Sequence, residues 1–236
     1  LESNNFWNKI WNERGRFYPE DDPAKIAGYD QAFSSFSNET LNEITNDIKK
    51  KLELQSSDSL FELGCGSGLL LNVLSNVVMD HAGTDLSAGM VERAKQLYPH
   101  LKVKQSDSLS LDFPDNSFSK LYVHAVFQYF PDYEYAEKVI DELFRIGKDN
   151  SIVHLSNIMD IDRKEEYIKA REQIGKQSGD VWKSSVKEAV SHLYYTKQFF
   201  NDYAIKRNLE CLILNRNIAG YMNAQFRFDV VLKKSK

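Results

Sequence analysis

Cysteine is scarce in this sequence. Only two cysteines occur in 236 residues, Cys65 and Cys211, and they lie far apart in the chain. A chain of this length does not depend on a disulfide framework, and no cysteine–histidine spacing typical of a metal site is present. We therefore expect neither structural disulfides nor a bound metal.

Clustered positive charge and long apolar runs are also absent. The net charge is −4, the isoelectric point is about 5.8 and no run of five Lys or Arg residues occurs. Nucleic acid is therefore not expected as a partner, because clustered cations supply that affinity. Without an 18-residue apolar run or a signal-peptide pattern, we expect a cytoplasmic protein with no membrane partner. The missing initiator methionine leaves open whether the chain is processed, tagged or part of a longer protein.

Short apolar runs alternate with helical patterns from residue 59 onward. With 42% hydrophobic residues, the chain can bury a sizeable core. Strand–helix alternation predicts an α/β fold, a Rossmann-like doubly wound sheet of seven strands, mostly parallel with an antiparallel C-terminal hairpin. The expected strands are 59–63, 78–84, 101–105, 119–124, 151–157, 210–215 and 224–233, and the helices between them are 68–76, 88–97 and 132–147.

Four segments are predicted along the chain. Residues 1–37 form an aromatic-rich, N-terminal helical lid that Gly15 and two prolines interrupt. Residues 38–158 form the cofactor-binding Rossmann-like core. Residues 159–195, dense in mixed charge, form a helical cap insertion, and residues 196–236 add a helix and strands that complete the sheet.

A glycine-rich turn follows the first expected strand, and it reads Glu62-Leu63-Gly64-Cys65-Gly66-Ser67-Gly68. A turn into a helix exposes unpaired backbone N–H groups, and glycine lets a ligand approach the main chain. The dinucleotide fingerprint G-x-G-x-x-G differs, since the third glycine here comes one residue early. A tight turn that merely requires glycine is the alternative interpretation.

This turn resembles the first motif of the class I S-adenosylmethionine-dependent methyltransferases, an acidic residue followed by x-G-x-G-x-G. The resemblance covers roughly residues 38–158 and implies S-adenosylmethionine as cofactor, bound at Gly64, Cys65, Gly66 and Gly68. It places Glu62 near the cofactor's amino group. A buried carboxylate is costly without a cation close by, which agrees with that role, whereas a surface-facing Glu62 at the strand end is the alternative.

Acidic residues after the next two strands extend the resemblance. Asp85 lies roughly 20 residues beyond the glycine turn, the spacing at which an acid accepts ribose hydroxyls in dinucleotide folds. The family places its ribose-binding acid here, with Leu86 beside it. The resemblance likewise gives Asp107, Ser108 and Leu109 to the adenine. Helix or loop capping is the alternative role for both acids.

The fourth expected strand ends in a candidate catalytic residue. His124 lies at the carboxyl end of that strand, where open α/β sheets bind ligands. We predict that it contacts the cofactor and serves as a base or orients the substrate, and a packed structural histidine is the alternative. Many relatives carry a His pair where Gln128 and Tyr129 stand, so a common candidate base is missing.

Further candidates lie in the lid, the fifth strand and the insertion. The resemblance folds the N-terminal segment over the cofactor, which makes Tyr18 and Tyr29 candidates for contact with the sulfonium. Candidate substrate-binding residues are Tyr129, Asn157, Asp160 and His192. Core or lid packing is the alternative for all of these side chains.

The resemblance implies methyl transfer to a hydroxyl, or to an amine, of a small molecule such as a sugar, a lipid-like compound or a natural-product intermediate. S-adenosylhomocysteine would be the product, and the protein would be a monomer or a homodimer. No Asn/Asp-Pro-Pro-Tyr motif follows the fourth strand, which disfavours base- or glutamine-directed transfer. A non-catalytic scaffold or binding module with this fold and a NAD-dependent oxidoreductase are the alternatives.

Overall fold

The computed structural model describes residues 2–19, 22–29, 36–178 and 190–234. A single sheet runs through it in the order β3-β2-β1-β4-β5-β7-β6. The first five strands are parallel, and β7 lies antiparallel between β5 and β6, so the predicted sheet and its C-terminal hairpin are confirmed. The strands are β1 (Ser59–Leu63), β2 (Asp80–Asp85), β3 (Val103–Gln105), β4 (Phe118–His124), β5 (Gly147–Met159), β6 (Leu209–Asn215) and β7 (Arg227–Lys234).

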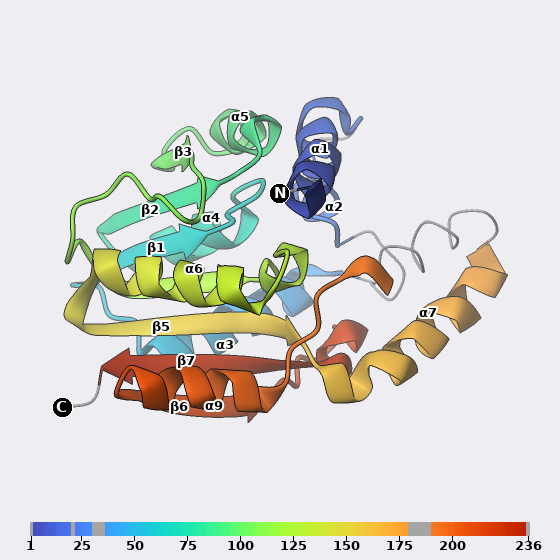
Figure 1. Cartoon of the computed structure of the whole chain (residues 1–236). Helices are drawn as coiled ribbons and strands as arrows, with labels where there is room; N and C mark the ends of the chain where they lie inside the picture. Colours follow the sequence, from blue (N-terminus) through green and yellow to red (C-terminus); the bar gives the residue numbers. More distant parts are fainter. Residues whose placement is uncertain (1, 20–21, 30–35, 179–189, 235–236) are drawn as a thin grey trace.

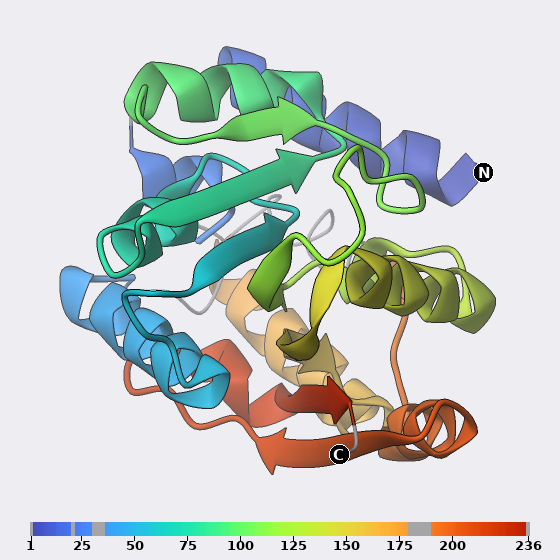
Figure 2. The ribbon, with the colours of Figure 1, turned by 90° about the vertical axis from the view of Figure 1, so that its left-hand side faces the viewer.

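Helices cover both faces of the sheet. Figure 1 shows α6 and α9 in front of the strands and α3 and α4 behind them, and Figure 2 shows the same layers from the side. One apolar core joins the strands to α6 and α9, and another joins them to α3, α4 and α5. These helices are α3 (Asn38–Leu52), α4 (Leu69–Ser75), α5 (Ala88–Leu97), α6 (Tyr133–Ile146) and α9 (Lys197–Lys206).

The apolar pattern explains this layering. Every residue of β1 is buried, as expected for a central parallel strand covered on both faces. On α3, the buried Ile44, Ile48 and Leu52 form one stripe that packs on the sheet. Ser37 begins that helix by accepting the Thr40 N–H at 3.2 Å.

Helix α1 (Glu2–Phe17), in the segment predicted to be a lid, packs on α5, beside the edge where the parallel strands end (Figure 1). The contact is a close backbone approach. A Cβ added to Gly15 would lie 2.4 Å from the carbonyl carbon of Gly89. The Gly89 N–H also donates to Asn12 Oδ1 at 2.8 Å. The helix therefore continues through Gly15, where the sequence predicted an interruption, because a residue without a side chain fits between the two helices.

The remaining elements surround the same edge of the sheet. They are α2 (Pro23–Ile26), η1 (Phe127–Tyr129), η2 (Ile161–Arg163), α7 (Lys164–Ser178) and η3 (Met222–Phe226). Helix α7 begins beyond the end of β5, within the segment predicted as a cap, and points away from the sheet (Figure 1). Trp182, another residue of that segment, lies outside the described residues. No helix in the described parts of the chain combines the length and apolarity needed to cross a bilayer.

Candidate functional site

A cavity opens where β1, β2 and β4 end, between the glycine turn and the lid helix α1. Parallel strands present their carboxyl ends at one edge of a sheet, and ligands of open α/β folds bind there. Many of the predicted site residues line this cavity: Tyr29, Glu62, Gly64, Cys65, Gly66, Asp85, Leu86, Ser108, His124, Tyr129, Asn157 and His192. Residues from seven separate segments thus meet in one place.

Three predicted residues lie outside the cavity and have local structural contacts. Gly68 caps α4 in the left-handed conformation (φ 81°), and a Cβ there would lie 2.9 Å from Leu101 Cδ1. Asp160 accepts the Asp162 N–H at 3.0 Å and pairs with Lys197 at 2.8 Å. The Tyr18 ring lies under the Arg14 guanidinium, 4.8 Å from the ring centroid. These three residues do not line the cavity, and their predicted contacts with cofactor or substrate stay predictions.

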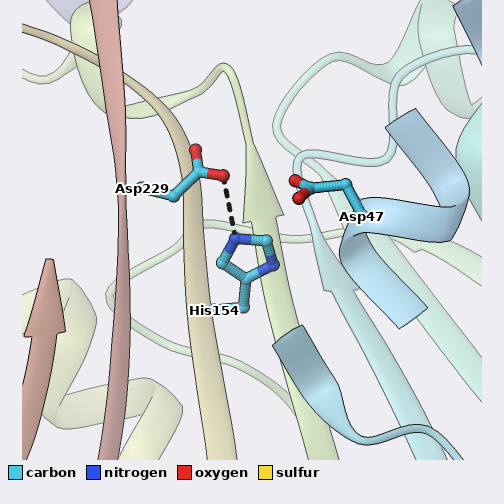
Figure 3. Close-up of side chains that lie close together, drawn as sticks. All are labelled: Asp47, His154 and Asp229. Atoms are coloured by element: carbon cyan, nitrogen blue, oxygen red, sulfur yellow. Dashed lines mark ion pairs between the residues drawn. The ribbon is translucent and has the colours of Figure 1, made fainter. Parts of the chain in front are cut away.

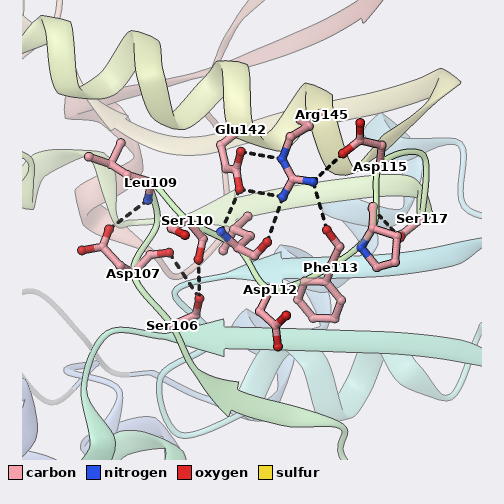
Figure 4. A network of polar contacts seen from close by, with 12 residues as sticks. Ser106, Asp107, Leu109, Ser110, Asp112, Phe113, Asp115, Ser117, Glu142 and Arg145 are labelled. Atoms are coloured by element: carbon pink, nitrogen blue, oxygen red, sulfur yellow. Dashed lines mark hydrogen bonds and ion pairs between the residues drawn. The ribbon is translucent and has the colours of Figure 1, made fainter.

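Asp107 and Leu109, in the loop after β3, are two further predicted residues that do not line the cavity, although their neighbours Ser106 and Ser108 do. The Asp107 carboxylate accepts the Leu109 N–H at 2.9 Å, which is the loop-capping alternative (Figure 4). Arg145 holds the far end of the loop, donating to the Leu111 carbonyl at 2.8 Å. Ser108 lines the cavity and shares a hydrogen bond with the Tyr135 hydroxyl at 3.0 Å, and that hydroxyl also donates to Asp107 Oδ1 at 3.4 Å.

The glycine turn presents bare backbone to the cavity. Gly64 and Gly66 have φ values of 73° and 51°, in the left-handed region that glycine tolerates best. A Cβ on Gly64 would lie 2.3 Å from Val126 Cγ2, so packing alone requires that glycine. A Cβ on Gly66 would have no heavy atom within 4 Å. Packing therefore does not require a glycine at position 66. The open space beside Gly66 leaves room for a ligand against the main chain.

Asp85 connects the end of β2 to that turn. Its Oδ2 accepts the Gly66 N–H at 2.9 Å, and its Oδ1 accepts the Ser87 N–H at 2.8 Å. Burial raises the pKa of the carboxyl, and these two N–H groups oppose the rise. Ser87 itself caps α5 by accepting the Met90 N–H at 3.3 Å. The capping role is therefore filled, and the Asp85 carboxylate lines the cavity.

Glu62 is a buried carboxyl on β1, with 2% of its surface exposed. Burial raises its pKa to about 8, although the neighbouring Tyr122 hydroxyl lowers it in part. Its Oε2 has no hydrogen-bond partner within the described residues. A buried carboxyl with unused acceptor capacity at a cavity wall is a suitable place for a cationic ligand group. Beside it, burial also raises the pKa of the Cys65 thiol well above its usual value, which keeps the thiol neutral.

His124 is held in one orientation by a buried chain of hydrogen bonds. Its Nδ1 lies 3.1 Å from Ser156 Oγ, and Arg216 Nη1 donates to that same oxygen at 2.7 Å. A serine oxygen that accepts from Arg216 still has its own proton to donate to Nδ1, and we predict this arrangement, which puts the imidazole proton on Nε2. Burial and the charge of Arg216 lower the pKa of His124 well below its usual value. His124 is thus neutral, and its Nε2 has no partner among the described residues.

Asp229 anchors that chain beneath the cavity floor. It pairs with Arg216 at 2.9 Å and with His154 at 3.4 Å, and Lys51 donates to it as well. Burial would raise the pKa of Asp229, but Arg216 and His154 lower it well below its usual range. Figure 3 shows Asp229, His154 and Asp47, which lie close enough to share a metal ion. Lys51 and Arg216 already neutralise these carboxylates, so we interpret the cluster as a buried ion-pair network.

The far side of the cavity, beyond β4, is built around Asn157. This residue lies at an irregularity of β5 and has a φ of 67°, which is unusual for a residue with a side chain. Its N–H donates to Asp229 Oδ1 at 2.7 Å, and its Nδ2 donates to the Tyr221 hydroxyl at 3.2 Å. Its carbonyl accepts from Arg227 at 3.3 Å. Asn157 Oδ1 is left buried without a partner in the described chain.

Aromatic side chains close the cavity from the lid. Tyr129 lies 4.8 Å from Trp7 of α1 and 5.5 Å from His192, measured between ring centroids. Burial, together with Arg227 and Arg171, lowers the pKa of His192 to about 3, so this residue is neutral. The sequence identified the lid aromatics as candidates for packing. It did not identify Arg227, Arg171 or Tyr221 as cavity residues, because a lone residue in an apolar or charged pattern gives no such signal.

Comparisons with known proteins find methyltransferases among the similar sequences and structures. Residues 61–155 match the family model described as a methyltransferase domain. An uncharacterized methyltransferase of Schizosaccharomyces pombe is 34% identical over 85 residues, 35% of this chain and 33% of that protein. Demethylmenaquinone methyltransferase of Lactobacillus johnsonii is 28% identical over 129 residues, 51% of this chain and 52% of that protein. The chain thus spans between a third and about half of these relatives.

Two of the solved structures that resemble this chain match it over nearly its whole length. Phosphoethanolamine N-methyltransferase 1 of Haemonchus contortus, with phosphoethanolamine and S-adenosylhomocysteine bound, has a TM-score of 0.69 at 11% identity; the match covers 98% of this chain and 48% of that one. Magnesium protoporphyrin IX methyltransferase of Synechocystis, with S-adenosylmethionine bound, has a TM-score of 0.63 at 13% identity. That match covers 100% of this chain and 98% of the other. At these identities the likeness is one of fold.

Proposed function

We propose that this chain, a class I S-adenosylmethionine-dependent methyltransferase, transfers a methyl group to a hydroxyl or an amine of a small molecule bound in the cavity. The observation that carries the proposal is the arrangement of Glu62, Gly66 and Asp85 around one end of that cavity. The cofactor is a nucleoside that bears an amino acid. Glu62 suits its ammonium group, the open backbone at Gly66 gives it room, and Asp85 suits its ribose hydroxyls.

The residues present fit that cofactor. Glu62 Oε2, buried and without a partner in the described residues, would accept from the ammonium group. Each oxygen of Asp85 accepts one backbone N–H and retains capacity for one ribose hydroxyl, because a carboxylate offers about four acceptor sites. Leu86 and Ser108 line the part of the cavity next to Asp85, where the adenine would lie. The cofactor supplies an activated methyl group when bound.

The protein's own part in the reaction is then placement. Methyl transfer requires the acceptor atom in line with the methyl group and water kept out. Trp7, Tyr129 and His192 form an aromatic wall over the cavity, which excludes water. The neutral His124, with its proton on Nε2, is suited to donate a hydrogen bond to the acceptor and not to remove a proton from it.

Several observations support a small acceptor. The cavity is covered by α1, and the chain carries a net charge of −4, which does not favour a nucleic acid. The names of the relatives and neighbours point to small molecules as well: demethylmenaquinone, phosphoethanolamine and magnesium protoporphyrin IX. These substrates differ in chemistry, so they support the size class and not one compound.

Methyl transfer to a small-molecule extract tests the proposal. The protein is incubated with S-adenosylmethionine labelled in its methyl group and with metabolites that pass a small-pore filter. We expect label in a low-molecular-weight product, and much less label with Asp85→Asn when S-adenosylmethionine is well below saturation. Tight binding of S-adenosylhomocysteine without transfer to any extract would instead favour a non-catalytic binding module.

A further inference from the structure

We propose that the methyl acceptor carries an oxyanion, a carboxylate or a phosphate, and that Arg227 binds it. The proposal rests on the proposed function and adds to it the charge of the substrate. Arg227 lines the cavity and is 93% buried, with a relative exposure of 7%. No carboxylate among the described residues lies within ion-pair distance of it.

The few contacts of Arg227 do not neutralise it. Its Nη1 donates to the Asn157 carbonyl at 3.3 Å, and its guanidinium lies 5.6 Å from the centroid of the Tyr167 ring. Its Nε has no partner among the residues that the structure describes. An uncompensated buried cation is costly, and proteins retain one where a ligand supplies the opposite charge. A guanidinium also offers paired N–H groups that match carboxylate and phosphate oxygens.

The position of Arg227 separates it from the cofactor's nucleoside. Strand β7 is antiparallel to β5, so its first residue, Arg227, lies at the edge where the parallel strands end. In the sheet order, β4 and β5 stand between β1 and β7. Three strand spacings amount to roughly 14 Å, at about 4.8 Å each. Gly66 and Asp85 are therefore at one side of the cavity and Arg227 is at the other, where the acceptor enters.

The charge balance of the cavity favours an anion on that side. Among the described lining residues, the acids are Glu62 on β1 and Asp85 on β2, and both lie on the side proposed for the cofactor. The cofactor, when bound, would bring a positively charged sulfonium into the cavity. An anionic acceptor would offset that charge, and Asn157 or Tyr221 would orient the rest of the molecule.

Oxyanion binding to the product complex tests the inference without turnover. The affinity for S-adenosylhomocysteine is measured first, by calorimetry, in the wild type and in each variant. The saturated complex is then titrated with sodium phosphate and, separately, with sodium acetate, replacing chloride at constant ionic strength. The emission of Trp7 and Trp11, both in the cavity lining, reports binding. We expect a saturable change with at least one oxyanion in the wild type.

Substitutions identify the site. Arg227→Gln should weaken the oxyanion at least about tenfold, on the scale of lost charged hydrogen bonds, and Arg227→Lys should weaken it less. Arg163→Gln is the matched control, because Arg163 is outside the cavity lining and pairs with Glu166 at 2.7 Å. It should leave oxyanion binding unchanged. All three variants should keep wild-type affinity for S-adenosylhomocysteine.

Other outcomes overturn the inference and are distinguishable from one another. If the wild type binds S-adenosylhomocysteine but neither oxyanion, the acceptor site is not anionic, and the proposed function stands. If Arg227→Lys and Arg227→Gln lose S-adenosylhomocysteine affinity but keep the oxyanion response, Arg227 holds the cofactor's own carboxylate. If the wild type does not bind S-adenosylhomocysteine, the proposed function fails and the inference fails with it.

Discussion

The Asp85 carboxylate accepts the Gly66 N–H at 2.9 Å, across the gap between the ends of β2 and β1. This single bond joins the two features that the sequence marked for the cofactor, the glycine turn and the acid of the second strand. The same carboxylate accepts the Ser87 N–H at the start of α5. Asp85 thus has two functions, to fix the turn and to present its remaining acceptor sites to the cavity.

Asp85→Asn should weaken S-adenosylhomocysteine binding about 10- to 100-fold, because charged hydrogen bonds to the ribose hydroxyls are lost. Calorimetry measures the effect directly. Asp80→Asn is the control, since Asp80 is at the other, exposed end of β2 and pairs with Lys102 at 2.9 Å. It removes the same charge and should not change the affinity. Equal affinities for all three proteins would refute the ribose role.

Gly66→Ala should mainly lower cofactor affinity, and Gly64→Ala should mainly lower thermal stability. At Gly66 the new Cβ has no neighbour within 4 Å, so the cost is the left-handed backbone, on the order of 1 kcal/mol, and a drop of a few degrees in Tm. Cofactor affinity should nevertheless fall at least about tenfold, because the methyl group projects into the ligand's place. At Gly64 the Cβ lies 2.3 Å from Val126 Cγ2, so Tm should fall much further.

Thermal unfolding and cofactor titration separate the two effects. Val126→Ala combined with Gly64→Ala should recover part of the lost Tm, because it removes the clashing methyl group. Wild-type cofactor affinity in Gly66→Ala would mean that the open space beside Gly66 is not where the ligand binds.

Glu62 should make cofactor binding depend on pH. In the ligand-free protein its pKa is about 8, so the carboxyl is protonated at pH 6. A bound ammonium group stabilises the charged form and lowers that pKa, so binding releases a proton. Affinity for S-adenosylhomocysteine should therefore rise from pH 6 to pH 8, by at most about tenfold per unit.

Glu62→Gln should remove this pH dependence. The amine of the ligand titrates identically for both proteins, so the difference between wild type and variant isolates the carboxyl. Calorimetry in buffers of different ionisation enthalpy counts the released protons. The same pH slope and proton release in both proteins would rule out Glu62 as the titrating group.

The hydrogen-bond chain from Arg216 should fix the tautomer of His124. Nitrogen-detected NMR of the imidazoles is practicable because the chain has five histidines, and His124→Asn assigns the signal. We expect a neutral ring with the proton on Nε2 from pH 6 to pH 8, since burial lowers the pKa well below its usual value. Ser156→Ala should remove this preference. A ring that titrates near pH 6.5 would contradict the assignment and restore His124 as a candidate base.

The strand and helix order could be predicted from the apolar pattern, but several boundaries could not. β5 begins at Gly147, but its continuous buried run begins only at Ser151. Residues 148–150 are exposed and carry no apolar pattern, so the sequence does not mark the start of the strand. α1 continues through Gly15, because the close approach to Gly89 is a tertiary contact. Local sequence determines an element's type better than its ends, which depend on what packs beside it.

The meeting of Glu62, Gly66 and Asp85 at one cavity could also be predicted, and the place of Arg227 in that cavity could not. Glu62 and Asp85 lie at the ends of the first two strands and Gly66 follows the first, so the motif alone brings the three together. Arg227 and Asp229 alternate with apolar residues, which in a sequence is typical of a solvent-facing side. β7 lies inside the sheet with helices on both faces, so these charged side chains are buried on the α3 side. Their roles depend on the antiparallel pairing with β5, which no local pattern specifies.

Calorimetric titration of the wild-type protein with S-adenosylhomocysteine, and separately with NAD, tests the central claim most directly. The account predicts saturable binding of one S-adenosylhomocysteine per chain and no heat with NAD. Binding of NAD without any binding of S-adenosylhomocysteine would contradict it.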